Sequence, residues 1–169
     1  MPLTTIETAR ILTVADAVVT QINTLDLAVI QNGLAAVRGY SFGFTDSELN
    51  KIQIVVRPED YANEEENRPA NAITQIYRIQ IGVLRKVPKR TTVQTDPVLN
   101  IAVMIARMFN VGKFLTVGSD EMQVVGQRFM PLYRHDANTL DNDTETQVRF
   151  DSRLDVDFQE LERPLAEAT

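Results

Sequence analysis

The sequence contains only one histidine and no cysteine, and the absence of cysteine excludes several kinds of chemistry. Without cysteine the chain forms no disulfide, offers no thiolate nucleophile and cannot bind zinc through sulfur. A cysteine-free chain must be stabilised by the burial of apolar side chains and by assembly with other subunits.

Long apolar runs are also missing. No stretch of about 20 apolar residues, the length that a membrane-spanning helix needs, is present. The first residues, MPLTTIETARIL, lack the basic head and apolar centre of a signal peptide. We therefore expect a chain that is made in the cytoplasm and has no membrane partner.

Basic residues are outnumbered by acidic ones, 17 to 23, which gives a formal net charge of −6. This balance argues against a surface that wraps nucleic acid, because neutralising phosphates requires clustered Lys and Arg. An acidic wall can still line a passage through which DNA moves. The 169 residues, 44% of them apolar, fit one domain, with a core over about 5–158 and a loose tail at 159–169.

Two stretches alternate apolar and polar residues with the period of a β-strand. The first is ITQIYRIQIGVLRKV at 73–87, and the second is VRFDSRLDVDF at 148–158. Such a pattern predicts strands with one face on a core and the other face in solvent or at an interface.

Three further segments predict extended structure. IQIVVRP reads as a strand closed by Pro58, and 122–134 as a strand interrupted at Pro131. In 25–40, Asn32-Gly33 predicts either a hairpin turn or, at Gly33, a bulge in one longer strand. The stretch SFGFTDSELNK predicts a turn and one short helical turn.

Two helices are predicted from their end signals. Thr4 and Glu7 have the spacing of a capping box and begin a helix over 5–22. Asp96 followed by Pro97 predicts a helix from Val98 to Asn110, ended by Gly112. Its expected inner face consists of Leu99, Ala102, Val103, Ala106 and Phe109.

The order of these elements predicts an α+β fold, with an antiparallel or mixed sheet of about four to five strands covered by two helices. Two acidic, polar stretches, 59–72 and 135–145, are expected to be long, mobile projecting loops.

Candidate catalytic and ligand-binding groups are few. His135 stands beside Asp136, but no Ser or Cys completes a triad, so we interpret it as a surface histidine. The run DNDTE at 141–145 lacks the glycine and the distant glutamate of a calcium loop. The seven glycines form no phosphate-binding motif. We therefore expect no enzymatic activity, no metal and no cofactor.

Charged residues are the remaining candidates for function, as contacts with other proteins. The basic set, expected at subunit or ring interfaces, consists of Arg85, Lys86, Lys89, Arg90, Arg149 and Arg153. The acidic set, expected to face a lumen or a partner, consists of Glu64, Glu65, Glu66, Asp141 and Asp143. The basic residues at the end of 73–87 fit either a solvated strand end or a contact with an acidic surface of a neighbouring copy.

The succession of segments resembles a group of small structural proteins of tailed phages and prophages, the tail terminator and neck (head-to-tail connector) proteins. The similarity covers roughly residues 11–158. It is carried by VADAVVTQIN, AAVRGY, LNKIQIVVRPED, the acidic loop with Arg68, ITQIYRIQIGVLRKV, the helix after Asp96, FMPLYR and VRFDSRLDVDF.

This resemblance implies a virion protein, assembled in the host cytoplasm, that forms a hexameric ring on the tail tube and joins the tail to the head. Its implied partners are further copies of itself, the tail tube protein, neck or connector proteins and, in a contractile tail, the sheath protein. DNA would pass through without specific binding. The long insertions at 59–72 and 135–145 depart from the simplest members, so another neck ring stays open as an alternative. A small α+β ligand-binding or enzymatic domain, or a monomeric adaptor, is a further alternative.

Overall fold

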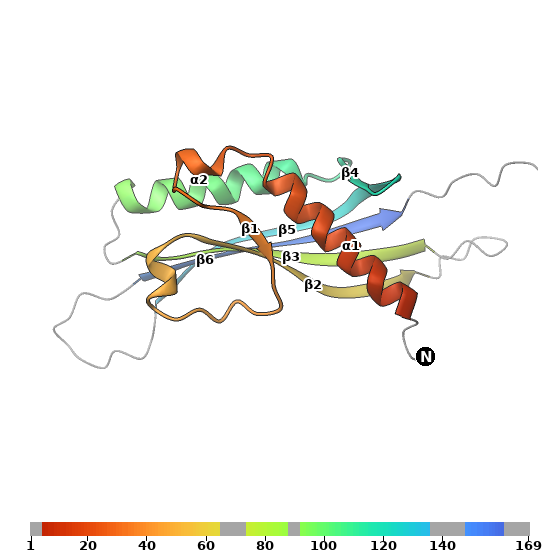
Figure 1. Cartoon of the computed structure of the whole chain (residues 1–169), viewed down its shortest axis with the longest axis horizontal. Helices are drawn as coiled ribbons and strands as arrows, with labels where there is room; N and C mark the ends of the chain where they lie inside the picture. The colour runs from red at the N-terminus through yellow and green to blue at the C-terminus, as the bar shows by residue number, and fades with distance from the viewer. Residues whose placement is uncertain (1–4, 65–73, 88–91, 136–147, 161–169) are drawn as a thin grey trace, which may run out of the picture.

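The computed structural model describes residues 5–64, 74–87, 92–135 and 148–160. In this part of the chain, two α-helices cover one face of a six-stranded mixed sheet (Figure 1). The predicted α+β class is confirmed, with six strands where four to five were expected.

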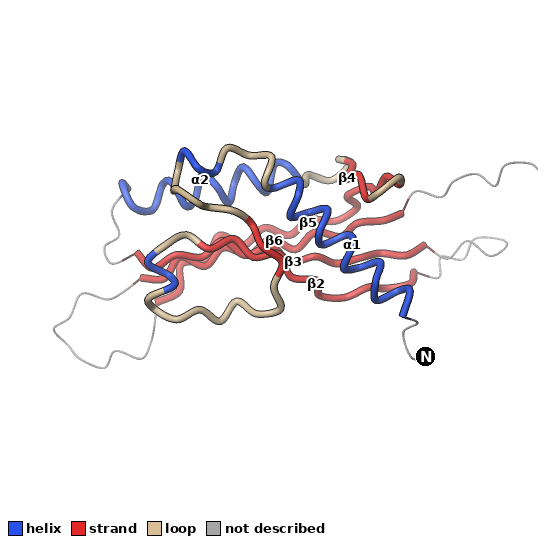
Figure 2. The backbone as a smooth tube through the Cα atoms, viewed as in Figure 1, coloured by secondary structure: helices blue, strands red, loops and turns tan. Residues whose placement is uncertain are grey.

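The long strands run side by side along the length of the molecule (Figure 2). Their order in the sheet is β1-β2-β3-β6-β5-β4, with β1 and β2 parallel and the other neighbours antiparallel. The elements are α1 (Thr5–Ile22), β1 (Ala36–Arg38), β2 (Gln53–Glu64), β3 (Thr74–Val87), α2 (Thr92–Met108), β4 (Phe114–Val117), β5 (Asp120–His135) and β6 (Val148–Glu160), with short 3₁₀ helices at Leu27–Val29 and Glu48–Asn50.

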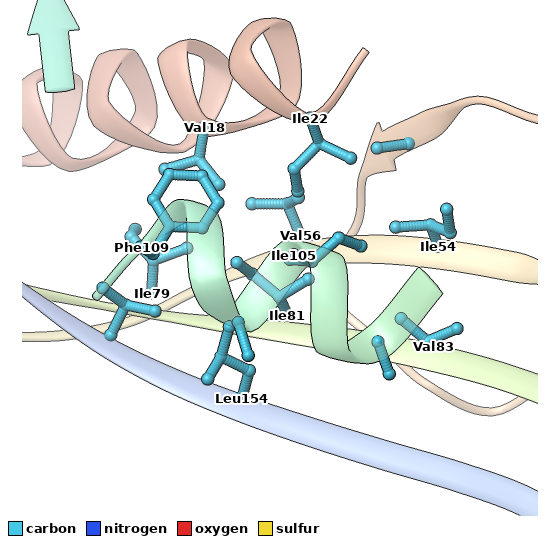
Figure 3. Close-up of a cluster of buried hydrophobic side chains, with 14 of the residues drawn as sticks. Val18, Ile22, Ile54, Val56, Ile79, Ile81, Val83, Ile105, Phe109 and Leu154 are labelled. Carbon is cyan, nitrogen blue, oxygen red and sulfur yellow. The ribbon is translucent and has the colours of Figure 1, made fainter. Parts of the chain in front are cut away.

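The main core lies between the helices and the sheet, as Figure 3 shows. Ile79 and Ile81 of β3 and Leu154 of β6 point toward the helices, which contribute Val18 from α1 and Ile105 from α2. The alternation of β3 and β6 thus places apolar side chains on one face as predicted. Complete burial of each such side chain stabilises the fold by roughly 1.5–3 kcal/mol.

The predicted bounds of the first helix are confirmed, but those of the second are wrong. Helix α2 begins at Thr92 and contains Pro97 in its interior. A proline at the sixth helical position removes one helical hydrogen bond. Burial against the sheet offsets that loss. The buried face is rotated from the predicted one, because Leu99 and Val103 are only partly buried. The buried residues are Val98, Ile101, Ala102, Ile105, Ala106 and Phe109.

Two strands continue through prolines that were expected to end or interrupt them. Strand β2 runs to Glu64, with a register shift between Pro58 and Asp60, and β5 runs through Pro131 to His135. A proline is tolerated at a bulge or on an edge strand, where its missing N–H breaks no ladder bond. Residues 59–64 and His135 are therefore strand rather than loop; 65–72 and 136–145 lie outside the described residues.

The segment 25–40 was also predicted wrongly. Within it, only Ala36–Arg38 forms a strand, and this strand is parallel to β2, so it is neither half of a hairpin nor one long strand. Gly33 has a positive φ of 74° in a turn. Both polar atoms of the Asn23 side chain bond the backbone of Ala36, at 2.7 and 3.1 Å, which fixes β1 to the end of α1. Strand β4, which follows α2, had no clear sequence signal.

Candidate interaction surface

The face of the sheet turned away from both helices is called the outer face. It carries the polar positions of the alternating strands, namely Arg57, Glu59, Arg78, Gln80, Arg153, Asp155 and Asp157.

One half of the outer face has balanced charges. The Arg78 guanidinium donates two hydrogen bonds to Asp157, at 2.8 and 3.1 Å, and the hydrogen bonds and charge of that carboxylate raise the pKa of Arg78 above its ordinary value. Gln80 donates to Asp155 at 2.7 Å. Gly126 leaves room for this arrangement, because a Cβ there would lie 2.9 Å from Asp157 Oδ2.

The other half is covered by the loop at 39–51, which builds a second, smaller core. Phe42 and Leu49 of this loop are buried against Val55 and Leu84 of the outer face. The prediction that the polar face of these strands lies in solvent or at an interface is therefore wrong at this end, where the chain's own loop covers it. Here Asp151 is buried as well, only 2% exposed.

The Phe42 ring occupies the space above Gly82. A Cβ at Gly82 would overlap Cδ1 and Cε1 of that ring, so only glycine lets the ring approach β3 so closely. The guanidinium carbon of Arg153 lies 3.6 Å from the ring centroid, and that of Arg57 lies 4.8 Å from it. Cation–π attraction of this kind contributes about 0.5–2 kcal/mol.

Beside Phe42 lies an open cleft of about 630 Å³, here called the arginine cleft. Arg57, Arg149 and Arg153 line it together with the carboxylate of Asp151. Asp151 accepts two hydrogen bonds from Arg153, at 2.5 and 3.0 Å, and Arg149 donates to the Phe42 carbonyl at 2.9 Å. Within the described part of the chain, the solvent-shielded Nε of Arg149 has no acceptor. Burying an unbonded donor costs about 1–3 kcal/mol, so Arg149 is held here against a local penalty.

Substituting Gly82 with alanine is expected to lower the free energy of unfolding by about 1–3 kcal/mol, because the new methyl group displaces Phe42. Chemical denaturation measures this loss. The control is the same substitution in a Phe42→Ala background, where the space is free and the added cost should nearly vanish. An equal cost in both backgrounds would contradict the contact.

The loop also carries a pH-dependent contact. Glu48 Oε2 accepts hydrogen bonds from the backbone N–H and the hydroxyl of Thr45, both at 2.7 Å. The backbone bond first, and the hydroxyl bond second, lower the pKa of Glu48 below its ordinary value of 4.5.

Because the folded pKa of Glu48 is depressed, its stabilising effect is present above 4.5 and is lost as the pH falls through the folded pKa. Glu48→Gln is expected to destabilise the protein at neutral pH and to have no effect once the carboxyl is protonated. Denaturation curves recorded at neutral pH and at a pH below the folded pKa of Glu48 measure this difference. An equal loss of unfolding free energy at both pH values would show that the charge of Glu48 plays no part.

The structure brings together only some of the residues predicted from the sequence. Arg149 and Arg153 both line the arginine cleft. Lys86 lies on the same face and bonds Asp46 at 3.2 Å, whereas Arg85 pairs in register with the core residue Phe150 and so lies on the helix-facing side. Glu64 is the last residue of β2. The other predicted positions lie outside the described residues: Lys89, Arg90, Glu65, Glu66, Asp141 and Asp143.

Arg57 and Phe42 belong to the cleft but were not predicted as site residues. The available signal was Gly82, a glycine inside a strong strand pattern, which often marks a close approach by another part of the chain. Nothing in the sequence identifies Phe42 as the approaching side chain.

The sheet has two open edges. Strand β1 pairs only with Ile54–Val56 of β2, and β4 pairs only with residues 120–123 of β5. Among the described residues, the rest of β2 and of β5 therefore has a strand neighbour on one side only. Such edges offer backbone N–H and C=O groups to another chain.

The described residues contain no group of three or more His, Cys, Asp or Glu placed to hold a metal ion. Over the same part of the chain, neither helix is long and apolar enough to cross a bilayer.

Comparison with known proteins gives structural neighbours only. No protein-family model and no curated protein matches the chain. A chain described as part of the virion of a native gene transfer agent particle is 17% identical; the match covers 86% of this chain and 91% of that one, with a TM-score of 0.51. What the two share is a fold. A second solved chain is 9% identical; the match covers 93% of this chain and 98% of that one, with a TM-score of 0.52.

Proposed function

We propose that this chain is a structural protein of a phage or phage-like virion, and that it forms the tail-terminator ring that joins the tail tube to the head. The observation that carries the proposal is the fold likeness to a chain of a gene transfer agent virion, which extends over most of both chains. The segment order that resembles terminator and neck proteins points the same way. Another ring of the neck is the alternative.

The two open edges suit a ring. A cyclic assembly uses a heterologous interface, in which each subunit presents two different complementary surfaces. The free edges of β2 and β5 lie on opposite sides of the sheet, so one copy can add its β2 edge to the β5 edge of the next by strand addition. We propose six copies, as in the proteins that the sequence resembles.

The acidic charge fits a passage for DNA. A wall rich in carboxylates does not retain the phosphate backbone, whereas clustered Lys and Arg would bind it and slow its passage. We assign Glu64, Glu65, Glu66, Asp141 and Asp143 to lumen or partner contacts, and the net charge of −6 supports this assignment.

Light scattering of the purified protein, alone and mixed with the tube protein encoded beside it, tests the proposal. We expect a particle of about six times the chain mass of 19.0 kDa, and ring-shaped caps on tube ends in negative-stain images. Caps on tube ends favour the terminator, whereas rings that bind only connector proteins favour another neck layer. A strict monomer that binds neither tubes nor connectors would contradict both.

A further inference from the structure

The arginine cleft is a positive site on an acidic chain. Its lining contains three guanidiniums, those of Arg57, Arg149 and Arg153, and a single carboxylate, that of Asp151. Arg57 also bonds Glu59, just outside the cleft, at 2.9 Å. Asp151 pairs with Arg153 and Glu59 with Arg57, so the cluster keeps a surplus of one positive charge, that of Arg149, and this surplus suits an anionic partner.

We propose that the arginine cleft of one copy binds the acidic run Glu64–Glu66 of a second copy. The planar guanidinium presents paired N–H donors that match the two oxygens of a carboxylate. Glutamate side chains of a second copy can enter an open cleft from the solvent side. The Phe42 ring supplies the apolar floor on which the Arg57 and Arg153 guanidiniums already lie.

Carboxylates fit the cleft better than nucleic acid does. Three arginines form too small a footprint to follow a phosphate backbone, which needs a row of basic residues. Asp151 in the lining, and Glu59 and Asp155 on the same face, would lie against the neighbouring phosphates and repel them. A short acidic peptide avoids these residues because it places only two or three charges in the cleft.

Strand geometry requires the acidic run to come from another copy. Glu64 pairs with Thr74 at one end of β3, whereas Arg153 pairs with Gly82 and Arg149 with Lys86. At about 3.3 Å per residue, these two arginines lie about 26 and 40 Å along β3 from Thr74. Glu66 is only two residues beyond Glu64, which adds at most about 7 Å of backbone. The run cannot therefore reach Arg149 or Arg153 of its own chain.

A contact between opposite ends of the outer face joins copies head to tail, which is the heterologous geometry of a ring. The inference thus rests on the proposed assembly and names one of its contacts. The carboxylates Asp141 and Asp143 are competitors for the cleft, because their segment, 136–147, precedes Arg149 directly in the chain.

The test is the binding of a labelled peptide with the sequence of residues 60–69, DYANEEENRP, measured by fluorescence anisotropy at protein concentrations too low for self-association. We expect salt-sensitive binding to the wild type. Exchanging the three glutamates for glutamine in the peptide should weaken binding at least tenfold, and this control needs no variant protein. Arg57→Gln combined with Arg149→Gln should have a similar effect. Arg107→Gln on α2 combined with Lys113→Gln, which removes the same two positive charges at exposed positions outside the cleft, should have none.

Four results would overturn the inference. The first is equal binding of the glutamate and glutamine peptides, or of the peptide to the wild type and the cleft variant. The second is tighter peptide binding after Asp141→Asn and Asp143→Asn, which would show that the chain's own segment occupies the cleft. The third is binding of a single-stranded oligonucleotide through the same arginines. A ring that forms normally without Arg57 and Arg149 would refute this contact and leave the proposed ring intact.

Discussion

Replacing Phe158 with alanine is expected to lower the free energy of unfolding by about 3–5 kcal/mol. Phe158 is 0% exposed and lies in β6 between Tyr77 of β3 and Val124 of β5. Its ring meets that of Phe109 edge to face, with centroids 5.9 Å apart. Removing it leaves a cavity beneath the end of α2 that the hydrogen-bonded strands cannot close. Urea denaturation followed by circular dichroism measures the loss.

Phe114→Ala is the matched control, because the Phe114 side chain is 58% exposed and its removal should change stability by no more than about 0.5 kcal/mol. A double-mutant cycle with Phe109→Ala should give a coupling of about 0.5–1.5 kcal/mol for the aromatic pair. A Phe158→Ala loss no larger than the Phe114→Ala loss would contradict the packing of α2 on the sheet.

The centre of the sheet could be predicted from the sequence because its strands alternate. Strands β3 and β6 each have one face in the main core, so burial imposes period two on residues such as Ile79, Ile81 and Leu154. Helix α1 was predictable for the equivalent reason, since only one side of it is buried. These patterns follow from the environment of one element and need no knowledge of its neighbours.

The prolines show where local signals mislead. Pro58 and Pro131 lie on strands with an open edge, and Pro97 lies inside a helix that is held by the sheet beneath it. In each case the cost of a missing N–H depends on the neighbouring elements. That information enters only when the topology is known, so a proline in the sequence predicts an end that the fold does not require.

The arginine cleft could not be predicted as a unit, because its parts are far apart in the chain. Phe42, Gly82 and Arg153 meet only after β3 and β6 have paired and the loop at 39–51 has folded over them. The alternation of β6 placed Asp151 and Arg153 correctly on the outer face. It could not show that the loop covers this part of that face and buries Asp151.

Asp151→Asn is expected to destabilise the protein by about 3 kcal/mol, because removing one partner of a buried ion pair leaves the other charge uncompensated. Asp151 is 2% exposed and holds Arg153 through two hydrogen bonds. Asparagine keeps the shape but removes the charge, and the Arg153 side chain, only 16% exposed, cannot turn fully into water. Thermal or urea denaturation measures the loss, and Asp16→Asn on the exposed side of α1 is the control.

The double substitution Asp151→Leu and Arg153→Met distinguishes two roles for this ion pair. Replacing a buried pair by apolar side chains of similar size is often neutral or stabilising, so we expect the double variant to regain most of the stability that Asp151→Asn loses. If it does so and also binds the acidic peptide weakly, the pair serves recognition by holding one guanidinium over Phe42 in the cleft. If the double variant is as unstable as Asp151→Asn, the pair is needed to attach the loop at 39–51 to the sheet, and recognition then depends on Arg57 and Arg149.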